Sequence, residues 1–269
     1  VKDYSKVLEN AISNGIKIYN DAYISCANKA FGYDRKHDNH LALLNKMFNE
    51  DKIQEKIVKC KTMEEAFNII KSYPLIGNFM AYQLVTDINY SEVVNWQEDE
   101  FTVAGPGSLR GIKKCFIDKG KMSSEDIIRY MYDHQDEEFK RLNLNFKRIG
   151  NRPLQLIDCQ NIFCELDKYC RQALPDLKSN RTKIKKHYVP KKEIIEYIYP
   201  PKWKLNKMGE NFPHTNLYGS INSVLAGHNF YSNTLKNIKR GLNYFDKFFL
   251  FLVVSRYYYI NTTSHSFPP

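Results

Sequence analysis

The sequence lacks any run of 18 apolar residues, about the length that a helix needs to cross a bilayer. Its most apolar stretch, FDKFFLFLVVSRYYYI, has only eight uncharged residues between Lys247 and Arg256. The amino-terminal stretch VKDYSKVLEN also lacks the pattern of a signal peptide. We therefore expect neither a membrane protein nor a secreted one, and we predict no membrane partner.

Closely spaced metal ligands and a nucleotide-binding loop are also missing. None of the six cysteines forms a CxxC pair, so a structural zinc site is not favoured. His37 and His40 have an i, i+3 spacing that suits a metal, but polar residues that open a helix explain them better. The stretch AGPGSLRGIKK lacks the GK[ST] ending of a P-loop. We predict free thiols in a reducing, cytoplasmic compartment, with no metal and no cofactor.

The hydrophobic pattern is helical rather than alternating. Thr62 with Glu65, and Ser123 with Asp126, have the spacing that begins a helix. We predict an all-α protein. Its domains are expected to be a helical domain at 1–206 and, packed on it, an aromatic and basic helical extension at 207–269.

Positive charge favours a polyanionic partner. Forty Lys and Arg residues against thirty Asp and Glu residues give a formal net charge of +10. The many aromatic side chains suit base stacking as well as core packing. The stretch 178–192 has seven basic residues and no acid, and is interpreted either as a solvated linker or as a segment laid against DNA.

The stretch SYPLIGNFMAYQLVTDINYS (72–91) predicts two helices joined by a tight turn, a helix-hairpin-helix candidate. A glycine in the turn lets a DNA backbone approach, and the first amides of the second helix point toward phosphate. We predict backbone contacts at Ile76, Gly77, Asn78 and Phe79, which position DNA without reading its sequence. An ordinary helical pair is the alternative.

Acidic residues follow this turn. Asp99 and Glu100 lie 22 and 23 residues after Gly77, a distance at which DNA glycosylases built on this hairpin place a carboxylate. A fixed carboxylate stabilises the positive charge on a sugar whose glycosidic bond breaks, or activates water. We predict Asp99 or Glu100 as the catalytic acid, with Asp158 as the next candidate. A solvated acidic loop is the alternative.

The glycine-rich stretch AGPGSLRGIKK (104–114) is typical of an anion-binding loop at a helix start. We expect its two lysines to be solvated and charged, because a buried, neutral lysine needs an apolar pocket that this stretch does not suggest. The predicted phosphate contacts are Gly105, Gly107, Ser108, Arg110, Lys113 and Lys114.

A second polar constellation lies in LQLIDCQNIFCELDKYCR (154–171). A helix that starts near Asp158 buries one side of this stretch and leaves Asn161 and Glu165 on the face of Asp158. The side chains expected to pack inward are Ile162, Phe163, Leu166 and Tyr169. Asp158 either orients its neighbours or is a plain N-cap.

Amide side chains on this helix suit the edge of an extruded base. We predict that Gln160 and Asn161 read the base. The full set of predicted base-binding residues is Tyr82, Gln83, Gln160, Asn161 and Glu165.

Four stretches together carry a family resemblance: SYPLIGNFMAYQLVTDINYS, EDEFTVAGPGSLRGIKKCF, LQLIDCQNIFCELDKYCR and YPPKWKLN. They resemble the alpha-glutamyl/putrescinyl thymine pyrophosphorylase family, which includes the helical domain of 5-hydroxymethyluracil DNA kinases. The resemblance covers roughly residues 19–206. It implies the helix-hairpin-helix DNA glycosylase fold and action on modified pyrimidines in phage and anti-phage settings. The family pattern has a single Asp before the Phe of the AGPG block, whereas this chain has Asp99 and Glu100, so the choice between them stays open.

The leading interpretation is a monofunctional DNA glycosylase that extrudes a modified pyrimidine from double-stranded DNA and hydrolyses its N-glycosidic bond. The second is a transferase that displaces phosphate or pyrophosphate from a 5-methyl-modified pyrimidine. The third is a non-catalytic DNA-binding module. The expected partner is DNA that contains modified pyrimidines, and no obligate protein partner is inferred.

Overall fold

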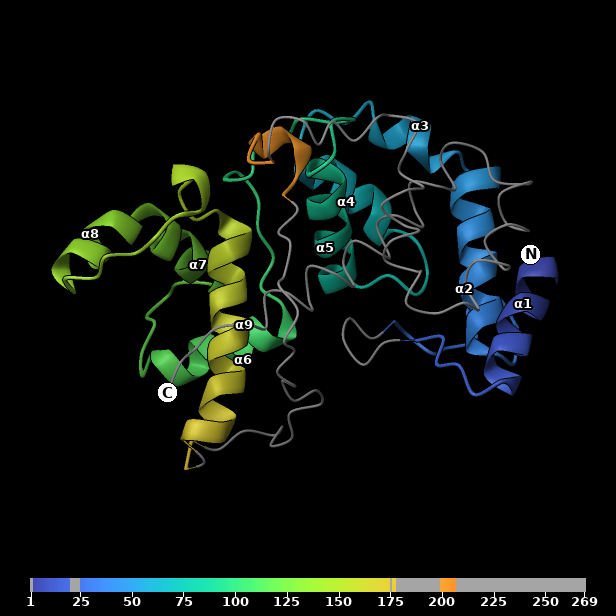
Figure 1. The fold of residues 1–269 in the computed structure, drawn as a ribbon, viewed down its shortest axis with the longest axis horizontal. Coiled ribbons are helices and arrows are strands. Elements are labelled where there is room, and N and C mark those ends of the chain that lie inside the picture. Colours follow the sequence, from blue (N-terminus) through green and yellow to red (C-terminus); the bar gives the residue numbers. More distant parts are fainter. Residues whose placement is uncertain (1, 20–24, 175, 178–198, 207–269) are drawn as a thin grey trace. The chain divides into compact units, whose positions relative to one another are not determined.

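The computed structural model describes residues 2–19, 25–174, 176–177 and 199–206 (Figure 1). Within these residues the chain forms nine α-helices and no strand, which confirms the predicted all-α class. None of the described helices combines the length and the apolar composition needed to cross a bilayer. The predicted extension at 207–269 and the basic stretch at 178–192 lie outside the described residues.

The helices range from five to 18 residues. They are α1 (Lys2–Ser13), α2 (Lys36–Asn45), α3 (Ile53–Ile57), α4 (Met63–Lys71), α5 (Asn78–Asn89), α6 (Pro106–Cys115), α7 (Ser124–Asp133), α8 (Gln135–Arg141) and α9 (Leu156–Ala173). A π-helical turn, η1 (Lys46–Glu50), continues α2, and two 3-10 turns are η2 (Ile149–Asn151) and η3 (Pro201–Trp203).

The chain divides into two compact units, and each is described by itself. The described parts of the smaller unit are residues 2–16 and 199–206. In the second of these parts the Asn206 amide donates to the Tyr199 carbonyl at 3.0 Å and accepts from the Tyr199 N–H at 2.9 Å. The motif YPPKWKLN therefore forms a closed turn around η3. The predicted domain boundary after residue 206 stays a prediction.

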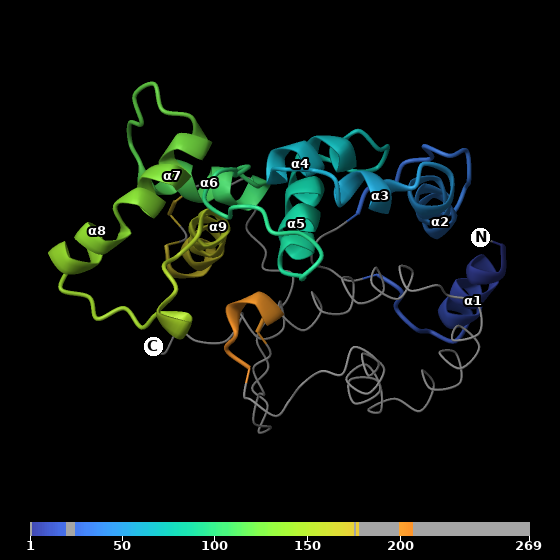
Figure 2. The same ribbon diagram turned by 90° about the horizontal axis from the view of Figure 1, so that it is seen from above.

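In the larger unit, α2 to α5 surround a first hydrophobic cluster, and α4 packs along α5 (Figures 1 and 2). The buried residues of α4 recur at the spacing of an amphipathic helix, namely Met63, Ala66, Phe67 and Ile70. The predicted start of α4 is confirmed, because the Thr62 hydroxyl accepts the Glu65 N–H at 3.2 Å. This pair of helices joined by a short turn fits the predicted hairpin, while likeness to a glycosylase fold stays a prediction.

A second cluster lies between α6, α7 and α9. The predicted capping box at α7 is confirmed: Ser123 accepts the Asp126 N–H at 3.0 Å, and Asp126 accepts the Ser123 N–H at 2.8 Å. The most extensive helix contact in the unit joins α6 to α9, which cross closely in both views (Figures 1 and 2). This crossing fixes how the glycine-rich stretch lies on the helix that carries Asp158.

Glycines make the close approach of α6 to α9 possible. A Cβ atom on Gly111 would lie 2.0 Å from the Phe163 carbonyl oxygen, and one on Gly107 would lie 2.2 Å from Cys164 Sγ. At Gly111 the obstructing atoms are backbone, so α6 meets the α9 backbone there only because Gly111 lacks a side chain, whereas at Gly107 the obstructing atom is a side-chain sulfur. The glycines therefore have a packing role, and contact with phosphate stays a prediction for Gly107.

We expect Gly111→Ala to lower the free energy of unfolding by about 3 kcal/mol, the upper part of the usual range for overpacking, because the obstructing atoms are backbone and cannot rotate away. The matched control is Gly77→Ala, whose Cβ would meet nothing within 4 Å. That control should change stability by less than about 1 kcal/mol. Urea unfolding of both variants measures the difference, and equal midpoints would contradict this account of the α6–α9 contact.

The helix α9 begins earlier than predicted. Gln155 is its N-cap, and Asp158 occupies the third helical position, where its carboxylate accepts the Gln155 N–H at 2.8 Å. The alternative that Asp158 is itself the N-cap is therefore wrong. Asp158 is the carboxylate partner of a capping box, which holds its side chain at the start of the helix.

The inner face of α9 also differs from the prediction. Phe163 is buried as expected, but Ile162 is 43% exposed and Tyr169 is 57% exposed. The buried face instead includes the polar residues Gln160 and Asp167. Gln160 bonds to Gly105, just before α6, and Asp167 bonds to Arg110 and Lys114 on α6. Because these polar side chains are buried by their partners, the positions of the apolar residues alone do not identify the buried face of α9.

Candidate functional site

The two hydrophobic clusters meet at a polar junction. Val103 packs on the first cluster and the next residue, Ala104, on the second. On α9, Ile157 belongs to the first cluster and Leu156 to the second. The segment 98–105 and the amino end of α9 therefore lie where the clusters meet. All three predicted catalytic carboxylates lie on these two elements, and we call this region the junction.

The chain enters the junction from a fixed point at Trp96. The Asn89 side chain at the end of α5 accepts the Trp96 N–H at 2.9 Å and donates to the Trp96 carbonyl at 3.0 Å. The indole N–H donates to the Cys60 carbonyl at 2.9 Å. Because Trp96 is buried and makes three hydrogen bonds, it fixes the position of the backbone from which the acidic segment begins.

Helix α7 holds the acidic segment from the other side. Arg129 donates to the backbone carbonyls of Asp99 and Glu100, both at 2.9 Å. The Tyr132 hydroxyl donates to the Asp99 carboxylate at 3.1 Å. Asp99 is half-buried, whereas Glu100 is exposed. The alternative of a solvated acidic loop therefore fits Glu100 better than Asp99.

Arg152 joins the carboxylates of Glu98 and Asp158. Its guanidinium donates to the carboxylate of Asp158 at 3.1 Å and to that of Glu98. All three side chains are about one-fifth exposed, at 19% for Arg152, 21% for Asp158 and 23% for Glu98. The bridge brings the acidic segment and the start of α9 together, so the structure assembles acids that are far apart in sequence.

Tyr82 lies near enough to two of these carboxylates, Asp158 and Glu98, to be affected by their charge. It is 1% exposed, and its hydroxyl donates to the Phe101 carbonyl at 3.4 Å. Burial raises the pKa of Tyr82, and the charges of Asp158 and Glu98 raise it further, against a hydrogen bond with Thr102 that lowers it. Tyr82 is therefore a neutral hydrogen-bonding group at physiological pH. The predicted neighbour Gln83 is also buried.

Covalent catalysis by the nearest thiol is disfavoured. Burial, with a further contribution from Asp158, raises the pKa of Cys159 to about 12. A thiol with such a pKa is almost entirely protonated at neutral pH and is a poor nucleophile. The junction therefore offers carboxylates, arginines and tyrosines, rather than a thiolate, as its chemical groups.

The predicted base-reading residues of α9 differ in availability. Gln160 is fully buried; its oxygen accepts the Gly105 N–H at 3.2 Å and its amide donates to Asn161 at 2.8 Å. Asn161 is half-buried at the edge of the junction. Glu165 lies about one turn beyond Asn161 on α9 and pairs with Lys168. Base reading stays a prediction for all three, with Asn161 the most accessible to a ligand at the junction.

The hairpin turn leaves its glycine open to solvent. Its left-handed residue is Leu75, with φ of +67°, whereas Gly77 is extended and caps α5. Gly77 and Asn78 are exposed, and the space beside Gly77 is open. The ring of Phe79 lies against Gly105, which joins the hairpin to the glycine-rich stretch. DNA contact at Ile76, Gly77, Asn78 and Phe79 stays a prediction that this open face permits.

Most of the predicted phosphate contacts are internal. Gly105, Gly107 and Ser108 are buried, and Lys113 is exposed. The expectation that both lysines are solvated is wrong for Lys114, whose side chain is 7% exposed and lies 2.9 Å from Asp167. Lys113 is therefore the residue of this group best placed to meet a phosphate in the observed conformation.

Asp167 is a buried carboxylate with three basic partners. Arg110 and Arg171 donate to one of its oxygens, and Lys114 donates to the other, all at 2.9 Å. Burial alone would raise the pKa of Asp167, but the hydrogen bonds from Lys114 and Arg110 and the charge of Arg171 hold it below its ordinary value. These contacts bind α6 to α9, and the sequence analysis did not find them.

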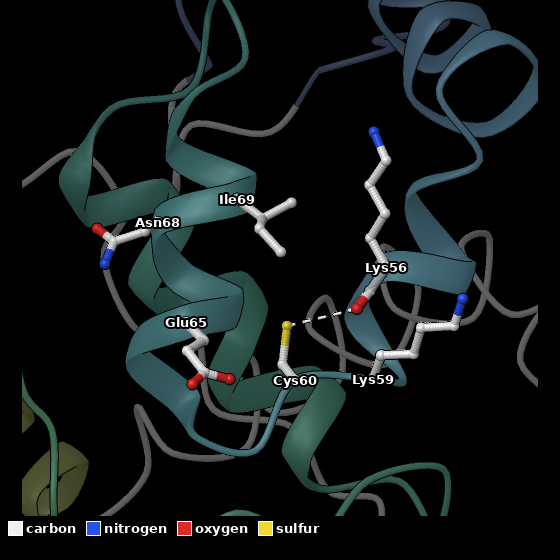
Figure 3. Close-up of a pocket in the computed structure, with 6 residues that line it drawn as sticks. All are labelled: Lys56, Lys59, Cys60, Glu65, Asn68 and Ile69. Atoms are coloured by element: carbon white, nitrogen blue, oxygen red, sulfur yellow. Dashed lines mark hydrogen bonds between the residues drawn. The ribbon is translucent and has the colours of Figure 1, made fainter.

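Two other features do not join the junction. An open hollow of about 420 Å³ lies between α3 and α4 (Figure 3), and none of its lining residues was predicted to be functional; they are Lys56, Lys59, Cys60, Glu65, Asn68 and Ile69. His40 receives the Tyr19 hydroxyl at one ring nitrogen, 2.7 Å away, and lies 2.9 Å from the Cys26 carbonyl at the other. Both nitrogens of His40 are thus engaged by protein atoms.

Comparison with known proteins places these observations in a family. Residues 1–179 match the family described as "5-hmdU DNA kinase, helical domain". The 5-hmdU DNA kinase of Bacillus phage SP10 is 29% identical over 170 residues, which cover 58% of this chain and 27% of the phage protein. No solved structure matches the chain. The chain belongs to the helical-domain family of the 5-hmdU DNA kinases.

Proposed function

We propose that the chain binds double-stranded DNA containing a 5-hydroxymethylated pyrimidine, receives the extruded base at the junction, and catalyses substitution at the modified methyl group. The observation that carries this proposal is a gathering of half-buried carboxylates and arginines at the junction of a domain whose family is named for 5-hmdU in DNA; they are Glu98, Asp99, Asp158, Arg129 and Arg152. The match covers only 27% of the phage DNA kinase, so the activity of that whole protein is not assigned to this chain.

The chemistry of substitution suits these groups. In the proposed step an amine nitrogen attacks the 5-methylene carbon of a base that carries phosphate or pyrophosphate there. The carbon–oxygen bond breaks, and the leaving group departs with the electron pair. A carboxylate accepts the proton of the amine, and a guanidinium stabilises the negative charge on the leaving group. Asp99 is the proposed proton acceptor, because Tyr132 fixes its carboxylate while the side chain stays half-exposed.

A DNA glycosylase is the second candidate. The same half-exposed Asp99 can stabilise positive charge on a sugar or activate water. The comparisons name a DNA kinase family and no glycosylase, so hydrolysis of the glycosidic bond ranks below substitution. Neither reaction needs a P-loop, which the sequence lacks.

Product analysis separates the candidates. The full chain is incubated with duplexes carrying thymine, 5-hydroxymethyluracil or its phosphorylated forms, with and without an amine such as putrescine or glutamate, and the digested nucleosides are identified by mass spectrometry. Substitution predicts a new, heavier nucleoside that requires both the phosphorylated base and the amine. Free base with alkali-labile sites supports the glycosylase instead. Unchanged nucleosides in every mixture would contradict catalysis and leave a binding module.

The open face at Gly77 predicts a specific loss of DNA binding. Gly77→Glu should weaken binding to duplex DNA at low salt by about tenfold, because it places a negative charge where the α5 amides are proposed to face phosphate. Asn68→Glu is the matched control, since Asn68 is also exposed and lies on α4 away from the turn. Fluorescence anisotropy over a salt series measures both variants. Equal affinities of the two variants, or an affinity independent of salt, would contradict the backbone contact.

A further inference from the structure

An exposed apolar loop leads into the junction. The loop comprises residues 142–152, between α8 and the segment before α9, and we call it the 142–152 loop. Leu142 is 52% exposed, and Leu144 and Ile149 are each 54% exposed. Large apolar side chains gathered on one exposed segment mark an interaction surface more often than single exposed residues do.

The loop is held in place rather than loosely attached. Leu144 N–H donates to the Phe139 carbonyl at 2.8 Å, and Asn143, with φ of +52°, donates to the Lys140 carbonyl at 3.0 Å. This is the Schellman pattern that ends a helix with a left-handed residue, here asparagine. Phe146 then stacks on Phe139, with ring centroids 4.6 Å apart. The leucines are thus presented to solvent from a defined backbone.

The far end of the loop is anchored as well. The buried Gln135 side chain donates to the Leu154 carbonyl at 3.1 Å and accepts the Leu154 N–H at 2.8 Å. Arg148 pairs with Asp136 on α8. Just before Leu154, Arg152 bridges Glu98 and Asp158 at the junction. Both ends of the loop are therefore fixed, and one of them is part of the candidate site.

Charge on the loop favours a polyanion. From the end of α8 through the loop, residues 140–152, there are five basic residues and no acid; Lys140 and Arg141 belong to α8 and the other three to the loop. Three of the five are ion-paired, with Glu138, Asp136 or the junction carboxylates. Lys140 and Lys147 are exposed and have no ion-pair partner among the described residues. Positive charge beside exposed apolar side chains suits a surface that grips phosphate and contacts bases.

We propose that the 142–152 loop inserts Leu142 or Leu144 into the duplex beside the target base and so supports its extrusion toward the junction. This proposal rests on the proposed function, because an inserted side chain is needed only where a base leaves the stack. Extrusion costs stacking and pairing energy, and apolar side chains placed between base steps offset part of that cost. Arg152 places the carboxyl end of the loop next to the carboxylates that an extruded base would meet, while Leu142 and Leu144 lie at its α8 end.

The test uses the full chain and a duplex with 2-aminopurine next to 5-hydroxymethyluracil. Unstacking raises 2-aminopurine fluorescence, so the natural protein should increase it on binding. The double variant Leu142→Ser/Leu144→Ser should lose this increase and bind about tenfold more weakly, a change that corresponds to about 1.4 kcal/mol. Leu174→Ser is the control, since Leu174 is 48% exposed but follows the far end of α9, about 24 Å along the helix axis from Asp158.

A charge variant separates insertion from simple attraction. Leu144→Lys adds a positive charge, so a loop that only attracts phosphate would bind DNA more tightly and keep the fluorescence increase. Insertion predicts that the increase is lost despite the added charge. The proposal is contradicted if the unsubstituted chain does not raise 2-aminopurine fluorescence, or if the double serine variant raises it as much as the unsubstituted chain does. Leucine-dependent binding to anionic vesicles without any effect on DNA would also overturn it, and would assign the loop to a membrane surface.

The outcome is separable from that of the proposed function. Product analysis reports the reaction, whereas fluorescence reports the stack at the moment of binding. If the double serine variant forms modified nucleosides as well as the natural chain, the proposed function is kept and the proposed insertion by the 142–152 loop is contradicted. If the double serine variant fails to raise 2-aminopurine fluorescence, and neither the natural chain nor the variant forms a modified nucleoside, the insertion proposal is supported and the proposed catalysis is contradicted.

Discussion

Asp99→Asn is expected to reduce the rate of base modification by about 100-fold or more, the usual cost of removing one charged group that acts in the transition state. The asparagine keeps the shape of the side chain and can still accept the Tyr132 hydrogen bond, so DNA binding should change little. Single-turnover rates and equilibrium binding of the same variant separate the two effects.

Two further variants make this expectation specific. Glu100→Gln should keep near-normal activity, because Glu100 is exposed and its hydrogen bond to Arg129 uses the backbone carbonyl rather than the carboxylate. Tyr132→Phe should lose less than Asp99→Asn, since it removes one hydrogen bond and leaves the charge. If Asp99→Asn remains active while Glu100→Gln or Asp158→Asn does not, the assignment of Asp99 is wrong.

Asp167→Asn is expected to have the largest effect on stability, about 3–5 kcal/mol, because it leaves buried cations without their counter-charge. Lys114 and Arg171 are the most buried of these cations, at 7% and 8% exposure. Lys114→Met should cost less, since Arg110 and Arg171 still face the carboxylate. Denaturant unfolding at pH 7 gives both values, and an asparagine variant as stable as the natural chain would contradict the account of the α6–α9 contact.

The same carboxylate predicts how stability depends on pH. The pKa of Asp167 is lower in the folded chain than its ordinary value, so ionised Asp167 favours folding. Its contribution is fully present above the unfolded-state pKa of about 3.9 and is lost as the pH falls through the folded-state pKa. The difference in stability between the natural chain and Asp167→Asn should therefore shrink on acidification below about pH 4.

Local signals in the sequence were enough for much of the helical framework. The starts of α4 and α7 follow from side chains three residues apart, whose hydrogen bonds depend on neighbours in the chain alone. The acids after the hairpin were also found, since they cluster in sequence. Such signals are readable because each one is contained within a single turn or a single short loop.

Long-range contacts were not readable in the same way. Arg152 lies 54 residues from Glu98, and Arg110 lies 57 residues from Asp167. The residues next to a single arginine do not indicate which distant carboxylate it will contact, so these ion pairs were not predicted. The inner face of α9 was misjudged for the same reason, because Asp167 is buried only by virtue of its partners on α6. Gly107 and Gly111, which were assigned to an anion-binding loop, also make room for α9, a packing role that their local sequence does not indicate.

The central claim is that the junction recognises a 5-hydroxymethylated pyrimidine in duplex DNA. The most direct test is equilibrium binding of the full chain, at physiological salt, to two duplexes that differ only in one base, thymine or 5-hydroxymethyluracil. We predict at least about tenfold tighter binding to the modified duplex, equivalent to about 1.4 kcal/mol, and loss of that preference in Asn161→Ala. Equal affinity for the two duplexes would contradict the claim.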